Sequence, residues 1–162
     1  MPVKNNATRL LDSRKIHYEI FEYDASHFHA AAEVAQLIGV AVNQVYKTIV
    51  VLRENVVGTS RRSPLLIMVA ADKEIDLKRV AASLGEKKLK VAKHDEAEAL
   101  TGLQVGGISA LALLTKPFEP CIDRPALELS HVYVSAGQRG SNVKIGVQAL
   151  IQLTNAKIVD AT

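Results

Sequence analysis

The runs that decide the fold are Val45-Tyr46-Lys47-Thr48-Ile49-Val50-Val51-Leu52 and, after a polar segment, Leu65-Leu66-Ile67-Met68-Val69. Both are rich in β-branched and aliphatic residues, which favour strands. The residues between them, 53–64, are polar and include Gly58 and Pro64. We therefore expect a long β-hairpin at the centre of the molecule.

Helical and strand patterns flank this hairpin on both sides. Helices are expected over 6–14, 30–38, 76–84, 93–100 and 147–153, and further strands over 17–23, 132–134, 143–145 and 157–159. Several strands follow one another without an intervening helix. This order predicts an α+β fold, with a mixed, largely antiparallel, barrel-like β-sheet flanked by helices.

Length and composition narrow the class of protein. The 162 residues fit one domain spanning 1–162, and a hydrophobic content of 48% supplies a core. Aromatic residues make up only 4%, so a large platform for stacking nucleobases is not expected. The net charge of +3 suits either an ordinary soluble surface or a polyanionic partner contacted over a limited patch. It does not indicate a protein that binds duplex DNA.

Cysteine usage and the N-terminal residues indicate the compartment. Cys121 has no second cysteine to pair with, which is typical of a reducing environment. The opening residues 1–15 lack the apolar core of a signal peptide, and no run approaches the roughly 18 apolar residues of a membrane span. We expect a soluble, cytoplasmic protein without a membrane partner.

Motifs for common cofactors are missing from the sequence. It has neither a Gly-x-Gly-x-x-Gly turn nor a Gly-Lys-Ser/Thr loop, which disfavours nucleotide cofactors. His27 and His29 lack a third ligand nearby in sequence, so no metal is expected. Cys121 lies between apolar neighbours and is interpreted as a buried residue in preference to a nucleophile.

Lys47 is the unusual residue of the central hairpin. The two-residue period of a strand places it on one face with Val45, Ile49 and Val51. A lysine on an apolar face is costly to bury unless its ammonium reaches water or meets an anion. It either guards a sheet edge, pairs with a carboxylate, or lines a pocket for a phosphate, a carboxylate or a polarised carbonyl.

Two glycine-bearing segments are further candidates. Gly106-Gly107-Ile108-Ser109 is either a tight turn or a backbone that approaches a ligand closely and offers it amide donors. The segment Ser135-Ala136-Gly137-Gln138-Arg139-Gly140 taken alone indicates only a hairpin.

Taken together, residues 46–48, 101–109 and 132–140 resemble the YbaK family, free-standing relatives of the editing domain inserted in bacterial prolyl-tRNA synthetases. The similarity runs from the first helix to the last strand. It implies a trans-editing aminoacyl-tRNA deacylase that releases a mischarged amino acid, most often cysteine, from tRNA(Pro) or tRNA(Cys). The implied partners are the acceptor end of the tRNA and a synthetase, and no cofactor is implied.

The resemblance also implies a set of site residues. Lys47 matches the family's key lysine, which contacts the aminoacyl-adenosine end, and residues 106–109 match its Gly-x-x-x-Pro loop. The implied catalytic residues are Lys47, Gly106 and Ser109, and the implied substrate-binding residues are Tyr23, His27, Phe28, Gly107, Ile108, Ala110, Gly137 and Asn142.

The sequence departs from the family pattern at four positions. Ala110 stands where the loop normally ends in proline, and Ala112 where a glycine commonly follows. His29 and Ala136 also replace usual glycines. Loss of proline removes a fixed φ and restores a backbone N–H, so the departures affect the expected amino-acid specificity more than the fold.

These departures leave two other functions open. One is a tRNA- or synthetase-binding module that has lost activity, and the other is a regulatory protein that binds a small molecule in the same pocket. Basic residues are either tRNA backbone contacts or solvated surface, and they are Arg53, Arg61, Arg62, Lys87, Lys88, Lys90 and Lys93.

Overall fold

The computed structural model describes residues 5–54 and 63–162. Its helices are α1 (Asn6–Ser13), α2 (Ala31–Ile38), α3 (Leu77–Leu84), α4 (His94–Thr101) and α5 (Val147–Thr154), with short 3-10 turns η1 (Val42–Gln44), η2 (Ala110–Leu113) and η3 (Arg124–Glu128). Its strands are β1 (Tyr18–Glu22), β2 (Tyr46–Arg53), β3 (Leu65–Ala70), β4 (Leu89–Val91), β5 (Glu119–Asp123), β6 (His131–Ser135), β7 (Ser141–Gly146) and β8 (Lys157–Val159).

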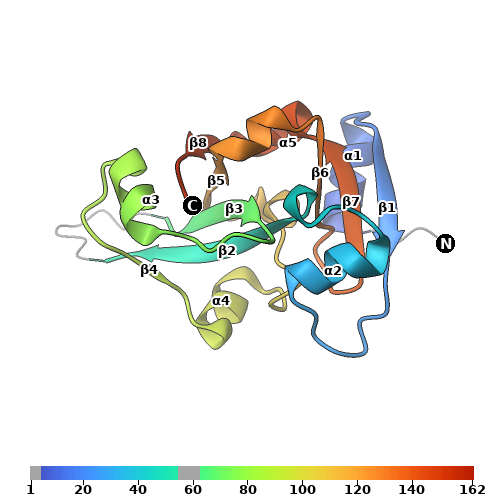
Figure 1. Cartoon of the computed structure of the whole chain (residues 1–162), viewed down its shortest axis with the longest axis horizontal. Coiled ribbons are helices and arrows are strands. Elements are labelled where there is room, and N and C mark those ends of the chain that lie inside the picture. Colours follow the sequence, from blue (N-terminus) through green and yellow to red (C-terminus); the bar gives the residue numbers. More distant parts are fainter. Residues whose placement is uncertain (1–4, 55–62) are drawn as a thin grey trace.

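The strands form two sheets. One has the order β1-β7-β6 and is antiparallel throughout, and the other has the order β4-β2-β3-β5-β8. In the second sheet β2 pairs antiparallel with β3 and β4, whereas β3-β5 and β5-β8 are parallel. A parallel bridge between Val45 and Tyr133 joins the sheets. Figure 1 shows the three-stranded sheet at one end of the molecule and α3 at the other.

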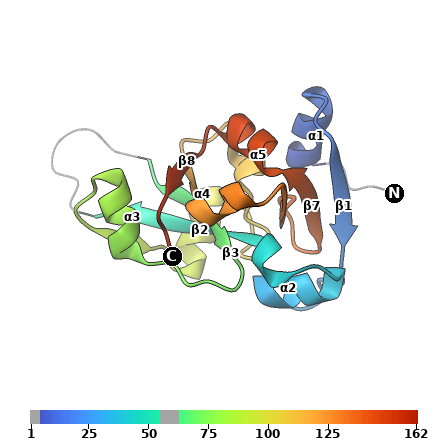
Figure 2. The same cartoon turned by 45° about the horizontal axis from the view of Figure 1, so that its top comes forward.

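The two faces of β2 and β3 pack against different helices. Tyr46, Val50 and Met68 belong to the largest apolar cluster, which includes buried residues of α1, α4, α5 and the three-stranded sheet. The opposite face, with Val51 and Leu65, packs against α3. Figure 2 gives a second view of α3 beside the far end of this strand pair. The predicted α+β architecture with a mixed, largely antiparallel sheet is confirmed, but the pairings in the described segments give two open sheets where a barrel-like one was expected.

Local signals define most helix ends. Asp76 accepts hydrogen bonds from the amides of Lys78 and Arg79, which caps the start of α3 as the sequence predicts. At the N-terminus, Asn5 and Thr8 form a capping box for α1. α2 ends at Gly39, also as predicted. No helix among the described residues is both long and apolar enough to cross a bilayer.

The sequence prediction omits three features that lie in the centre of the sheet or beside it. β4 and β5 were not expected, and β5 lies between β3 and β8 in the interior of the larger sheet. Arg53 was assigned to the polar loop, but it is the last residue of β2 and its side chain is only 3% exposed. Residues 55–62 of the predicted loop, which include Arg61 and Arg62, lie outside the described residues.

Candidate functional site

A cavity of about 460 Å³ lies where the two sheets meet. Its wall comes from the segment after β1, the start of α2, β2, the turn after β3, the segment before η2 and the facing ends of β6 and β7. The lining residues are Tyr23, Phe28, His29, Ala30, Ala31, Ala32, Val34, Val45, Tyr46, Lys47, Thr48, Ile49, Ala71, Glu74, Val105, Gly106, Ile108, Ser135 and Asn142. Such a volume accommodates a small molecule of about nucleoside size.

Among the described residues that line this wall, Lys47 is the only lysine and Glu74 is the only carboxylate. The half-buried Lys47 has no hydrogen-bonded or ion-paired partner among the described residues, so the carboxylate-pair alternative does not apply there. Glu74 comes from the turn that follows β3, and the amide of Ala71 donates to the carbonyl of Val45 at 2.8 Å, which holds this turn beside the start of β2. The cavity therefore presents one positive and one negative group.

The segment 105–108 is fixed from two sides. Glu98 of α4 accepts a hydrogen bond from the Val105 amide at 2.9 Å, and Arg139 donates from Nε to the Val105 carbonyl at 2.7 Å. Gly106 then adopts φ +95°, where a β-carbon would also approach the Phe28 ring to 3.2 Å. This backbone position requires glycine.

The amides of this segment differ in availability. The Gly107 amide already donates to the Gln104 carbonyl at 2.8 Å. The amides of Gly106 and Ile108, both in cavity-lining residues, have no acceptor among the described residues. These two amides can donate to a ligand oxygen, as a site that stabilises a developing oxyanion requires.

His29 fastens the segment between β1 and α2. Its Nδ1 is 3.2 Å from a Glu33 carboxylate oxygen, and its Nε2 is 3.1 Å from the Asp24 carbonyl oxygen. Both partners are acceptors, so each contact is a hydrogen bond when the ring nitrogen that makes it carries a proton. The hydrogen bond from His29 lowers the pKa of Glu33 below its ordinary value. His29 also makes an edge-to-face contact with Tyr23, at 6.1 Å between ring centroids.

The structure brings about half of the sequence-predicted site residues into the cavity wall. These are Tyr23, Phe28, Lys47, Gly106, Ile108 and Asn142. His27 is exposed and is not a lining residue, and neither are Gly107, Ser109, Ala110 and Gly137. Ser109 is buried, and its hydroxyl has no partner in the described segments.

Sequence reasoning missed several polar residues of the wall. Thr48, Glu74 and Ser135 line the cavity, and His29 was noted only as a departure from the family pattern and a weak metal ligand. Alternation along β2 carries no signal for Thr48, because this strand is covered on both faces. Glu74 belongs to a charged turn in which no local pattern distinguishes it from Asp72.

The structure also bears on two other chemical candidates, Cys121 as a nucleophile and a metal site. The Cys121 thiol is buried, and desolvation raises its pKa to about 11, which makes it a poor nucleophile. Within residues 5–54 and 63–162, no group of three or more His, Cys, Asp or Glu side chains is placed to hold a metal ion.

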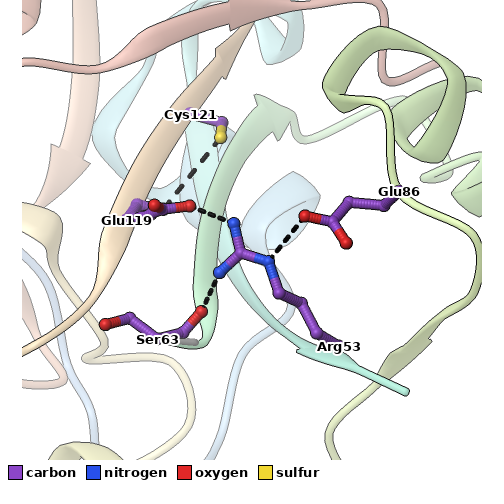
Figure 3. Close-up of polar contacts among 5 residues, drawn as sticks. All are labelled: Arg53, Ser63, Glu86, Glu119 and Cys121. Atoms are coloured by element: carbon purple, nitrogen blue, oxygen red, sulfur yellow. Dashed lines mark hydrogen bonds and ion pairs between the residues drawn. The ribbon is translucent and has the colours of Figure 1, made fainter. Parts of the chain in front are cut away.

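Arg53 is not the solvated surface residue that was one of its two predicted alternatives, because its side chain is 3% exposed and engaged by acceptors within the fold. Its guanidinium donates to Glu86 at 2.9 Å and also bonds the Glu119 carboxylate and the Ser63 carbonyl (Figure 3). These bonds link the ends of β2 and β5 to the segment after α3. Four lysines of the predicted basic set are exposed, and they are Lys87, Lys88, Lys90 and Lys93.

Comparison with known proteins assigns the fold and the cavity to a family. A model of the aminoacyl-tRNA editing domain matches residues 25–153, a range that contains every cavity-lining residue except Tyr23. The chain belongs to this family. The YbaK-type resemblance seen in the sequence is thereby confirmed, and the family supports an editing function on aminoacyl-tRNA.

Individual relatives agree with this assignment. A protein of Enterococcus faecalis named "Putative Cys-tRNA(Pro)/Cys-tRNA(Cys) deacylase" is 31% identical over 98% of this chain and 93% of its own length. A crystal structure titled "a putative trans-editing enzyme for prolyl tRNA synthetase" shares 25% identity and a TM-score of 0.79 over 99% of both chains. The crystal structure of a hypothetical protein, 22% identical, has a TM-score of 0.83 over 97% of this chain and 99% of its own, and shows the same editing-domain fold.

Proposed function

We propose that this editing domain acts in trans in the cytoplasm and releases mischarged cysteine from tRNA(Pro) or tRNA(Cys). The observation that carries the proposal is a cavity lined by Lys47 and by Gly106 and Ile108, whose amides have no acceptor among the described residues. The name of the Enterococcus faecalis relative supports cysteine as the amino acid. The structural relative named for prolyl-tRNA synthetase supports a synthetase as a partner.

In the proposed complex, the terminal aminoacyl-adenosine enters the cavity. Lys47 binds a phosphate or ribose oxygen of this nucleotide, and the Gly106 and Ile108 amides bind the ester carbonyl oxygen. The acceptor oxygens of Glu74 and Asn142 lie in the same wall and suit the substrate's α-ammonium group. Ser109 is buried behind the segment, so its proposed role is to support the loop that carries these amides.

The reaction depends on positioning, because no Ser-His-Asp or Cys-His set lines the cavity within the described segments. The ester is already activated. The attacking group is the substrate's own thiol or a water molecule, because a ribose hydroxyl would only move the ester to its own oxygen without releasing the amino acid. The ester's ribose oxygen leaves with a proton. Attack by water gives free cysteine, whereas attack by the thiol gives a cyclic thioester, so product analysis separates hydrolase from lyase chemistry.

The decisive experiment measures release of Cys, Ala, Ser and Thr from several mischarged tRNAs by the wild type and by Lys47→Ala. We expect release by the wild type to be fastest for cysteine. Lys47→Ala should lose most of this rate, because one charge-assisted contact to the reacting nucleotide is removed. If the variant keeps the full rate on every tRNA, the role of Lys47 is wrong.

The second candidate is a tRNA- or synthetase-binding module that has lost catalysis. Ala110, buried at the start of η2 where the family normally has proline, is the observation that favours it. Binding of tRNA without turnover on the full panel would support this candidate. A small-molecule regulator using the same cavity would instead show thermal stabilisation by unrelated anions and none by aminoacyl-adenosine analogues.

A further inference from the structure

An exposed aromatic ring lies at the mouth of the cavity. Phe28 lines the cavity, and its side chain is 49% exposed. The Arg139 guanidinium lies over this ring, with its carbon 5.3 Å from the ring centroid. The His94 imidazole at the start of α4 lies beside it, with ring centroids 6.3 Å apart and planes tilted by 59°. Three segments distant in sequence thus meet at one spot.

This cluster is held in place before any ligand arrives. Arg139 is fixed through its Nε hydrogen bond to Val105, and its backbone packs directly against Gly107. A β-carbon at Gly106 would approach the Phe28 ring and the Arg139 Nε, to 3.2 and 3.4 Å. The absence of side chains at both glycines therefore lets the ring and the guanidinium lie together at the cavity mouth.

The size of the cavity decides what reaches this cluster. About 460 Å³ holds one nucleoside with its amino acid and has no room for a chain of nucleotides. If a tRNA end enters the cavity, the nucleotides that precede the terminal one run outward over the mouth. Unpaired bases stack on aromatic rings and on guanidinium planes, and this contact tolerates any base.

We propose that Phe28, Arg139 and His94 form a one-base stacking shelf for the nucleotide that precedes the terminal nucleoside of an unpaired RNA 3′ end. The shelf rests on the proposed function in so far as that function brings a tRNA end to the cavity. It is a single ring with a flanking cation, which agrees with the low aromatic content of the chain.

The charges around the shelf favour a base over a phosphate. Lys93 precedes His94 and is exposed, but Asp95 and Glu96 occupy the first turn of the same helix. The carboxylates offset the lysine, so this end of α4 has no excess of positive charge. Binding energy from the shelf should therefore come from stacking and depend weakly on salt, in contrast to a phosphate contact.

The test uses an RNA hairpin that carries no amino acid and has an unpaired ACCA 3′ overhang, with 2-aminopurine in place of the penultimate base. The wild type should quench the 2-aminopurine fluorescence on binding. Phe28→Ala should abolish the quenching and weaken binding about tenfold, and Phe28→Trp should retain both. Leu127→Ala, which also removes an exposed apolar side chain (42% exposed) but in η3, serves as the matched control and should behave as the wild type.

Two results would overturn the shelf: quenching that is the same in Phe28→Ala and the wild type, or no quenching in the wild type when the hairpin is bound. A blunt hairpin without the overhang should bind equally to all variants, and sensitivity of the blunt hairpin to Phe28→Ala would also contradict the proposal. The assay needs no ester cleavage. If the protein binds RNA through Phe28 but releases no amino acid, the proposed function is wrong and the proposal of the stacking shelf is still supported.

Discussion

Gly107 lies against the backbone of Arg139 so closely that a β-carbon at position 107 would sit 2.8 Å from the Arg139 nitrogen. The segment before η2 and the turn between β6 and β7 are in direct contact here. Both segments contribute to the cavity or its mouth, so a change in the distance between them should shift the positions of the Gly106 and Ile108 amides.

Gly107→Ala should push these two segments apart. Overpacking against backbone atoms costs about 1–3 kcal/mol, because neither main chain can rotate away as a side chain does. We expect a lower unfolding midpoint in urea and a loss of deacylation larger than the loss of stability predicts. Gly146→Ala is the matched control, since its β-carbon would meet only the Ser130 carbonyl oxygen at 3.8 Å. Equal effects of the two substitutions would contradict this interpretation.

Glu74→Gln should weaken recognition of a free α-ammonium group, because it removes the only carboxylate among the described lining residues and keeps the shape of the side chain. The measurement is the dissociation constant of a non-hydrolysable aminoacyl-adenosine analogue and of its N-acetyl form. We expect the wild type to prefer the free amine and the variant to lose that preference. Asp72→Asn removes an exposed carboxylate two residues away, outside the wall, and should leave the preference intact. If Glu74→Gln keeps the wild-type preference, the ammonium is bound elsewhere.

Arg53→Met should destabilise the fold by about 3 kcal/mol, because it leaves Glu86 and Glu119 without their shared cation. Glu119 is partly exposed, so the cost should fall at the low end for a broken buried pair. Arg124→Met breaks the exposed pair with Asp160 and should cost far less, because solvent screens that pair. Chemical unfolding measures both. A tRNA affinity that falls in Arg53→Met while the free energy of unfolding does not would support Arg53 as an RNA contact.

The free energy of unfolding should decrease as the pH rises above about 9. Burial raises the pKa of Cys121 to about 11 and that of Tyr46 to about 12. The folded protein then retains protons that the unfolded chain releases, which favours unfolding at alkaline pH. Well below pH 9 both groups are protonated in both states and have no effect. Urea midpoints at pH 8 and pH 10 measure the change, and Cys121→Ala should show a smaller decrease than the wild type. A decrease of the same size in both proteins would mean that Cys121 does not contribute to it.

Local chemistry made much of the fold predictable. The bounds of α3 follow from a capping Asp76 and a terminal Gly85, signals that act within a few residues. The pairing of β2 with β3 follows from two adjacent apolar runs. In the site, Lys47 was recognisable because a charged residue interrupts an apolar strand face. Gly106 was recognisable because paired glycines mark an unusual backbone.

Interactions between distant segments account for what the sequence did not show. β5 is held by parallel pairing with β3 and β8, and such pairing leaves no turn signature between the partners. Arg53 was assigned to the surface because its partners, Glu86 and Glu119, lie 33 and 66 residues further along the chain.

The sequence by itself determined the family, the mixed α+β architecture, and the two features around which the cavity is built, Lys47 and the Gly106 segment. Only the tertiary structure decided which residues complete the site. It brought Glu74 into the wall and placed Phe28, His94 and Arg139 together at the mouth. It also engaged the Gly107 amide internally, while the Gly106 and Ile108 amides have no acceptor in the part of the chain that the structure describes. The physical reason is that strand and helix signals are local, whereas a cavity wall is assembled from segments that only sheet pairing and core packing bring together.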